Sequence, residues 1–210
     1  MKNKLIKNNG YGLLETVVAV GLFAFVMLLT LSIFQSVNQS QKSSIASQTI
    51  QENLRYVLEI MSKEIRQGVR SDSSCLAGAT RRVYNRGTIG SNNNVLFFKK
   101  IKKDESGNAH EICVAYYLDN GRIRIEREDR YTTDLYSIDD YITPNDIIIN
   151  SFNFDIFDNL ITTLPESKFQ PRVNLRIEAE IRSGQSMYKQ PIFLQTSISS
   201  RTYGDNIYDD

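Results

Sequence analysis

The chain has few of the residues that enzymes and metal proteins use for their chemistry. Of its 210 residues, only one is histidine and two are cysteine. No Cys/His cluster with the spacing of a metal site is present, and the cysteines are too few for a disulfide scaffold. Cys75 and Cys113 fit either one disulfide outside the cytoplasm or two buried thiols that do not pair.

The chain also lacks an excess of charge of either sign. Lysine and arginine number 25, aspartate and glutamate number 24, and the formal net charge is +1. A protein this close to neutral is not a general binder of nucleic acid or of anionic membranes. Apart from one apolar segment near the N-terminus, enough chain remains for one globular domain of ordinary size.

The apolar segment, residues 11–34, has almost no polar side chains. Its sequence is YGLLETVVAVGLFAFVMLLTLSIF, about 24 residues, which lets a helix cross a hydrocarbon core of roughly 30 Å. One residue conflicts with that setting, because a carboxylate deep in a membrane helix costs about 2.5–3.5 kcal/mol on insertion scales. That residue, Glu15, is therefore a candidate functional residue that needs a positively charged partner.

A short basic head precedes this segment. It contains three lysines, it ends at Gly10, and no acidic residue occurs before Glu15. If the chain is cut after Gly10, Tyr11 gains an α-ammonium group within one helical turn of Glu15. The N-terminal end of the helix dipole also favours a carboxylate at this position.

The head and the start of the apolar segment resemble the class III signal of type IV pilins and pseudopilins. The match consists of the basic leader, Gly10 at the cut, Leu13, Leu14, Glu15 as the fifth residue of the mature chain, and the apolar run 17–24. Tyr11 and Gly12 depart from the phenylalanine and the threonine or serine that are usual there. The resemblance implies that a prepilin peptidase cuts after Gly10 and methylates Tyr11. It also implies that Glu15 pairs with the N-terminal ammonium group of a neighbouring subunit.

Three other interpretations of residues 11–34 stand beside this one. A secretory signal peptide has a shorter apolar core, roughly 7–15 residues, and a small-x-small cut site. A plain signal anchor accounts for the lysines and the span, but not for a glutamate five residues past a glycine. The third interpretation is a helix buried in the core of a soluble protein. The pilin-like interpretation accounts for the most features and is preferred.

The helix is predicted to continue well beyond the apolar segment. Residues 35–51 are polar but contain no glycine or proline, so nothing forces the helix to stop. An apolar stripe with helical period follows, made of Leu54, Val57, Leu58, Met61 and Ile65. Gly68 is the candidate C-cap. The sequence thus predicts one helix from about residue 12 to 67, roughly 80 Å long at about 1.5 Å per residue.

The rest of the chain reads as strands. Residues 69–94 are loop-like, apart from a possible short strand at 82–84. Beyond them the apolar period becomes two in six segments: 95–101, 111–118, 122–128, 147–157, 172–182 and 191–201. Asn120-Gly121 is the preferred two-residue hairpin turn. Such alternation predicts an antiparallel sheet with one wet face, and the helical stripe is expected to cover the dry face.

The predicted class is α+β, with a long N-terminal helix packed on an antiparallel β-sheet domain. This layout resembles the J-type pseudopilins and W-type minor pilins, which implies a pilin-like fold. The expected divisions are a leader peptide at 1–10, a transmembrane and assembly helix at 11–34, an amphipathic helix at 35–68 and an extracytoplasmic β-rich domain at 69–210.

No catalytic arrangement is visible in the sequence. His110 is expected at the surface beside Glu111, without a partner that would make it a ligand or a base. Acidic clusters at 104–105 and at 139–140 with Asp146 could bind calcium, but they lack the specific ligand spacing. The basic concentration consists of Arg81, Arg82, Arg86, Lys99, Lys100, Lys102 and Lys103. It is either a DNA-binding patch or, as preferred, a solvated strand edge protected by lysines.

The resemblance implies a minor pilin or pseudopilin, a non-enzymatic subunit of a type IV pilus-like or type II secretion-like filament. Its expected place is near the filament tip, where it helps to initiate assembly. The implied partners are other pilin or pseudopilin subunits, the prepilin peptidase, the inner-membrane assembly platform and the membrane, with nucleic acid only if the filament takes up DNA. No cofactor is expected. The N-terminus is expected inside the cytoplasm and the C-terminal domain outside it. The alternative is a membrane-anchored extracytoplasmic binding domain that does not polymerise.

Overall fold

The computed structural model describes residues 12–71, 75, 82–130, 136–158, 170–182 and 191–201. The chain divides into two compact units, residues 1–45 and residues 46–210. Gly10 and Tyr11, the predicted processing site, lie outside the described residues. The second unit, residues 46–210, is called the β domain.

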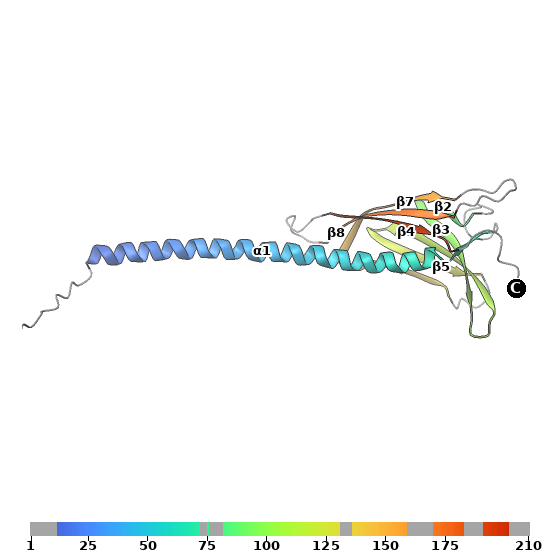
Figure 1. Cartoon of the computed structure of the whole chain (residues 1–210), viewed down its shortest axis with the longest axis horizontal. Coiled ribbons are helices and arrows are strands. Elements are labelled where there is room, and N and C mark those ends of the chain that lie inside the picture. The colour runs from blue at the N-terminus through green and yellow to red at the C-terminus, as the bar shows by residue number, and fades with distance from the viewer. Residues whose placement is uncertain are drawn as a thin grey trace, which may run out of the picture. The chain divides into compact units, whose positions relative to one another are not determined.

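One helix, α1 (Leu13–Ile65), passes from the first unit into the β domain (Figure 1). Its 53 residues confirm the predicted continuous helix, because the polar stretch 35–51 is helical throughout. Polar residues without glycine or proline carry no signal that stops a helix, and here none does.

Within the β domain, α1 buries the predicted apolar stripe. The buried helical residues are Ala46, Ile50, Leu54, Val57, Met61, Glu64 and Ile65, and Leu58 is partly buried. These positions recur at steps of three and four, so they share one face of the helix. The stripe prediction is therefore confirmed, with one charged residue inside the stripe that was not expected.

The C-terminal end of α1 is satisfied by residues far away in the sequence. The hydroxyl of Tyr84 donates to the carbonyl of Ile65 at 2.7 Å. The backbone N–H of Arg201 donates to the carbonyl of Arg66 at 2.9 Å, beside a 2.9 Å bond from Ser200 Oγ to the carbonyl of the first residue of β1. Such bonds replace the intrahelical partners that the last carbonyls of any helix lack.

Gly68 is not the predicted C-cap, and that prediction was wrong. The helix ends at Ile65, and Gly68 opens a short strand without a left-handed φ. A Cβ atom at Gly68 would lie 3.0 Å from the carbonyl oxygen of Ile65 and 3.0 Å from side-chain atoms of Val83 and Tyr84. A side chain at this position would force its neighbours to move by a few tenths of an ångström, and glycine avoids that crowding.

The first sheet contains six antiparallel strands. They are β1 (Gly68–Val69), β2 (Tyr84–Ile89), β3 (Asn92–Lys103), β4 (Ala109–Asp119), β5 (Arg122–Asp129) and β6 (Ile138–Tyr141). The order is β1-β3-β4-β5-β6, and β2 also pairs with β3. The predicted turn joins β4 to β5, with φ of 49° at Asn120 and 72° at Gly121. Two successive positive φ values explain the preference for Asn-Gly there.

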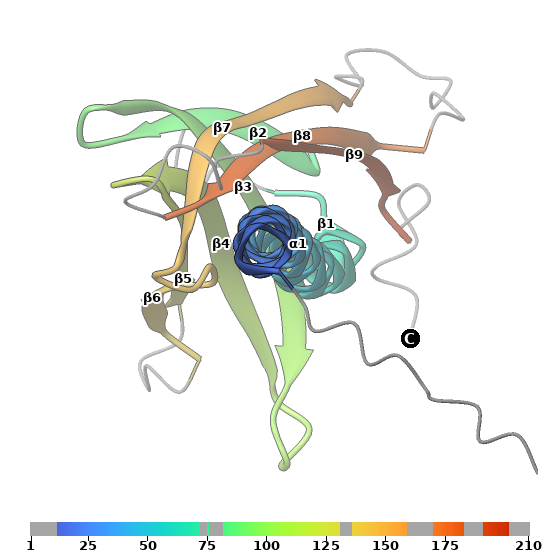
Figure 2. The same cartoon turned by 90° about the vertical axis from the view of Figure 1, so that its left-hand side faces the viewer.

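The second sheet has three antiparallel strands, β7 (Ile147–Phe157), β8 (Arg172–Ile181) and β9 (Ile192–Ser199), in the order β7-β8-β9. Burial in β8 alternates along the strand, as the period of two in residues 172–182 predicted: Val173, Leu175, Ile177 and Ala179 are buried, and Ile181 is partly buried. Figure 2 shows the strands of both sheets arranged around the C-terminal part of α1.

The core of the β domain joins the helical stripe to both sheets. It includes Met61 and Ile65 from α1, Tyr116 from β4, Phe154 from β7 and Leu175 from β8. The sequence predicted a single sheet with one wet face, and this was wrong in two respects. There are two sheets, and the second face of the first sheet also buries a cluster, made of Val95, Phe97, Ala115 and Tyr117.

Candidate functional site

The helix of the first unit exposes apolar side chains on every side. All residues from 12 to 37 are exposed, and the large apolar residues among them range from 82% exposed at Leu13 to 48% at Met27. By length and composition this helix can cross a membrane. A helix that is apolar all round needs lipid or other helices around it, because water does not stabilise such a surface.

Glu15 is the one charged residue between Gly12 and Gln41, and it lies in the first turn of α1. Its backbone N–H donates to the carbonyl of Gly12 at 3.0 Å. The carboxylate therefore belongs to the end of the helix where the dipole favours negative charge.

Cys75 and Cys113 form a disulfide, with their Cα atoms 5.5 Å apart. Both residues are buried, and Cys113 lies in the middle of β4. The bridge links the segment that follows β1 to the first sheet across a sequence separation of 38 residues. Such bonds persist mainly outside the cytoplasm.

A buried cluster of charges joins α1 to the first sheet. Glu64 Oε1 lies 2.5 Å from Nζ of Lys100 and 2.8 Å from Nη2 of Arg127, and Tyr116 donates its hydroxyl proton to Oε2. Burial acts to raise the pKa of Glu64, but the bonds from Lys100 and Tyr116 and the charges of Lys100 and Arg127 outweigh it and lower the pKa. Glu64 is thus held as a carboxylate inside the β domain.

The predicted basic concentration does not form one surface. Lys99 and Lys100 are buried on opposite faces of β3, where Lys99 pairs with Glu111 at 3.0 Å and Lys100 pairs with Glu64. Lys102 lies over the ring of Tyr136 at 3.9 Å. The prediction of a solvated, lysine-protected edge was therefore wrong at Lys99 and Lys100. Arg81, which also belonged to that group, lies outside the described residues.

His110 was predicted at the surface, and this was wrong. Only 7% of the residue is exposed. Its Nδ1 lies 3.1 Å from Oδ2 of Asp129, and its Nε2 lies 3.5 Å from Oδ2 of Asp104. The ring also meets the ring of Tyr136 edge-on, with 5.4 Å between centroids. His110 therefore links β4 to the end of β5 and to the turn that holds Asp104, and this arrangement is structural.

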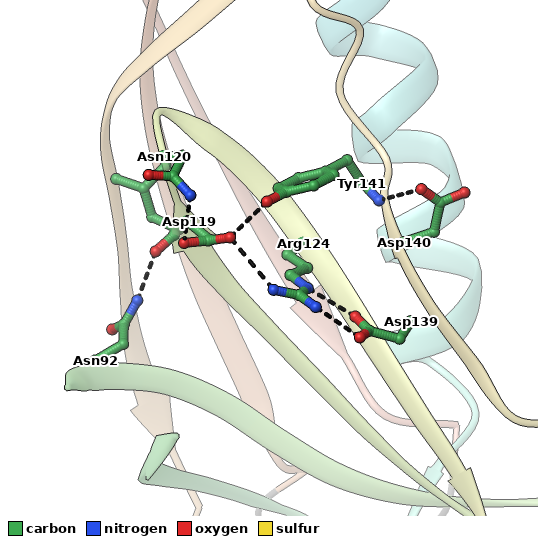
Figure 3. Close-up of polar contacts among 8 residues, drawn as sticks. Asn92, Asp119, Asn120, Arg124, Asp139, Asp140 and Tyr141 are labelled. Carbon is green, nitrogen blue, oxygen red and sulfur yellow. Dashed lines mark hydrogen bonds and ion pairs between the residues drawn. The ribbon is translucent and has the colours of Figure 1, made fainter. Parts of the chain in front are cut away.

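A polar cluster ties the strands β4, β5 and β6 together near the Asn120-Gly121 turn (Figure 3). Arg124 donates from Nε and Nη2 to the two carboxylate oxygens of Asp139, both at 2.6 Å. It also reaches Asp119 at 3.3 Å, and the hydroxyl of Tyr141 donates to the same Asp119 oxygen at 2.5 Å. The hydrogen bonds from Arg124 lower the pKa of Asp139.

This cluster bears on the calcium hypothesis, since Asp139 was one of its candidate ligands. Both oxygens of that carboxylate are engaged by Arg124. Asp104 accepts bonds from the backbone and the side chain of Asn108 at 2.7 and 3.0 Å. Within the described part of the chain, no group of three or more acidic, histidine or cysteine side chains is arranged to hold a metal ion.

Beside the polar cluster lies an open hollow of about 720 Å³. Its lining includes carboxamides from the start of β3, the β4–β5 turn and β7, together with Arg86 and Arg124. Two side chains of the first sheet donate hydrogen bonds to β7: Asn94 to the carbonyl of Phe152, and Arg86 to the carbonyl of Phe154. These side chains hold the two sheets together at this end of the β domain.

Glu64 was not predicted as a buried charge, although the sequence carries a signal for it. Glu64 follows Met61 by three residues and precedes Ile65, so it falls on the apolar stripe itself. A carboxylate at a stripe position predicts a buried positive partner, because buried charges are almost always paired. The partner, Lys100, lies in β3, and only the fold brings β3 close to Glu64.

The chain matches no protein-family model, no curated protein and no solved structure. The long apolar helix and the antiparallel sheets establish the α+β class. The features of the chain that bear on function are therefore the exposed apolar helix with its single carboxylate and the disulfide-bonded β domain.

Proposed function

We propose that this chain is a minor pilin or pseudopilin, a structural subunit that is anchored in the cytoplasmic membrane and then enters an extracytoplasmic filament. One observation carries the proposal. The N-terminal helix is exposed and apolar all round, and its one charge up to Gln41 is Glu15 in the first turn. A glycine five residues earlier and a lysine-rich head complete the resemblance to the pilin signal.

The position of Glu15 favours assembly over simple anchoring. An anchor gains nothing from a carboxylate in its span, and each buried charge there costs about 2.5–3.5 kcal/mol on insertion scales. Pairing with the N-terminal ammonium group of a neighbouring subunit offsets that cost, since both charges then share a low-dielectric site. Assembly of helix against helix therefore gives Glu15 a purpose that anchoring does not.

The β domain supports a location outside the cytoplasm. Its disulfide joins Cys75 to Cys113, and such bonds are rare where the cytosol keeps thiols reduced. The lysines at 2, 4 and 7 precede the apolar segment, and basic residues stay on the cytoplasmic side of a span. The two features together favour an N-terminus inside and a β domain outside.

The test is co-purification of the full-length chain with the other subunits of its host that carry the same leader. Glu15→Gln removes the charge and keeps the size of the side chain, so it should reduce recovery of these partners while leaving membrane insertion unchanged. Glu52→Gln is the matched control, because Glu52 is an exposed glutamate on the same helix within the β domain.

The rival function is a membrane-anchored binding domain that does not polymerise. It predicts an uncut Gly10–Tyr11 bond and equal recovery of partners with wild type and Glu15→Gln. Mass spectrometry of the mature N-terminus in a host with an active prepilin peptidase separates the two functions. An intact leader under those conditions would remove the main support for the filament subunit.

A further inference from the structure

The margins of the two sheets differ in how they are protected against pairing with other chains. Exposed edge strands present unpaired N–H and C=O groups, and proteins block them with short length, charge, proline, bulges or a covering segment. The margin strands here are β1, β2 and β6 in the first sheet and β7 and β9 in the second. Four of these five have an identifiable block.

In the first sheet, β1 has two residues and β6 has four, and β6 carries Asp139 and Asp140. β2 carries Arg86 and has an irregular register between Gly87 and Ile89. Short length, charge and irregular register are all devices that discourage a further strand. The first sheet is therefore protected on both sides.

In the second sheet, β7 is blocked by side chains and by the β4–β5 turn. Asn94 donates to the carbonyl of Phe152 at 2.7 Å, and Arg86 donates to the carbonyl of Phe154. The N–H of Ile149 donates to the carbonyl of Gly121 at 2.8 Å. These backbone groups face away from β8, so another strand finds the edge already occupied.

Among the residues that the structure describes, β9 has none of these devices. Its eight residues, IFLQTSIS, include no charged residue and no proline, and the strand pairs regularly with β8 along its whole length. In the part of the chain that the structure describes, the backbone of β9 makes no hydrogen bond other than those to β8. Phe193 is 70% exposed, and Ile192 and Leu194 are only partly buried. Figure 2 shows β9 at the margin of its sheet.

We propose that β9 is a docking edge, which accepts an extended segment of another polypeptide as a fourth strand of the second sheet. The unpaired backbone groups define the occupant as a β-strand, because alternate residues of an antiparallel edge present N–H and C=O together at a fixed spacing. The inference depends on the β domain alone and holds whether or not the chain joins a filament.

The side chains of β9 define the occupant further. Ile192 and Leu194 lie beside the core and remain partly exposed, so the incoming strand must supply apolar side chains at alternate positions on that face. On the other face Phe193 lies opposite Glu178, and Gln195 lies opposite Arg176. Because β9 itself offers no charge to pair, an uncharged segment with β-branched residues is the best match.

The probe for the test is a capped eight-residue peptide of alternating valine and threonine. It is N-methylated at every second residue so that only one of its edges can pair. Binding to the full-length protein in nanodiscs is measured by fluorescence anisotropy, and the site is located by hydrogen exchange. We expect protection to rise in residues 192–199 and to stay unchanged in β6.

Two lysine variants of the protein test the edge. Ser197→Lys places an ammonium group on the exposed face of β9 beside the incoming strand and should weaken binding about tenfold, because that charge must lose water. Asn153→Lys adds the same charge to β7, where Asn153 is exposed, and should leave binding unchanged. If Ser197→Lys loses its near-ultraviolet circular dichroism, Gln195→Lys takes its place, since Gln195 is exposed on the same strand.

Three outcomes would overturn the proposal. The first is equal binding of the peptide that is N-methylated at every residue, because that peptide cannot form edge bonds. The second is protection located outside β9. The third is protection of β9 that rises with protein concentration in the absence of peptide, which would identify a second copy of the chain as the occupant.

Discussion

Replacing Glu64 with glutamine tests whether the buried charge cluster stabilises the β domain. Glu64 is 8% exposed and provides the shared counter-charge of Lys100 and Arg127. Breaking a buried ion pair by removing one partner costs about 3–5 kcal/mol. Glutamine keeps an oxygen near Lys100, so we expect a loss of about 3 kcal/mol and a fall in Tm of roughly 6–12 °C for a domain of this size.

The assay is thermal unfolding of the full-length protein, followed by the near-ultraviolet circular dichroism of its tyrosines. Glu59→Gln is the control, because Glu59 is an exposed glutamate five residues earlier on the same helix. Its Tm should stay within about 1 °C of wild type, as expected for an exposed helix charge. Equal Tm values for Glu64→Gln and wild type would refute the reasoning that the cluster is stabilising.

The difference in Tm between wild type and Glu64→Gln should depend on pH. The pKa of Glu64 in the folded state lies below its ordinary value of 4.5, so the carboxylate adds stability above that pH. This contribution is lost as the pH falls through the folded-state pKa. The difference in Tm between wild type and Glu64→Gln should therefore be largest at neutral pH and shrink below about pH 4.5. A difference that grows on acidification would contradict the assignment.

Three further predictions concern processing, the disulfide and a close backbone contact. Gly10→Arg should abolish cleavage of the leader, because the proposed peptidase accepts only a small side chain before the cut, and mass spectrometry of the N-terminus checks this. Reduction, or Cys113→Ser, should destabilise the β domain by about 3–4 kcal/mol on the chain-entropy account of a loop of this size, and free-thiol titration of the unfolded, unreduced protein should find no thiol. Gly68→Ala should lower the free energy of unfolding by about 1–3 kcal/mol in chemical denaturation, since its Cβ would lie 3.0 Å from three atoms. Gly90→Ala is the control: its Cβ meets no atom within 4 Å, so it measures only the backbone cost at a φ of 56°.

The elements with strong periodicity could be predicted from the sequence. β7 matches its predicted range of 147–157, and β8 ends one residue before the predicted end at 182. The helix was found because polar residues without glycine or proline do not interrupt it. In these segments local pattern and global fold agree, which is the condition under which sequence patterns are informative.

The shorter strands could not be predicted in the same way. β2 lies within residues 69–94, which were expected to be loop-like, and it contains Gly87 and polar side chains. β6 is mostly exposed and shows no alternation of burial. Both strands form because a neighbour offers hydrogen bonds, β3 in one case and β5 in the other. The pairing leaves no period-two pattern in the short strand itself, even where the partner is as close in sequence as β3 is to β2.

The residues of the candidate site also differ in whether they could be predicted from the local sequence. Glu15 could be identified from its neighbours in the sequence, because its setting is a local run of apolar residues. The partners of Lys99 and Lys100 could not, because Glu111 and Glu64 reach them only after β3 pairs with β4 and packs on α1. Charged residues that look solvated in a sequence can be buried whenever the fold supplies a counter-charge.

The hydrogen bonds at the C-terminal end of α1 also have a consequence for folding during translation. Residues 200 and 201 donate to carbonyls at residues 68 and 66, so the end of the helix is completed by residues that leave the ribosome only after β9. Until β8 and β9 have left the ribosome, the stripe from Ile50 to Ile65 lacks both strands as packing partners. The nascent β domain thus exposes an apolar helix face for most of its translation, and it needs protection from other exposed apolar surfaces during that interval.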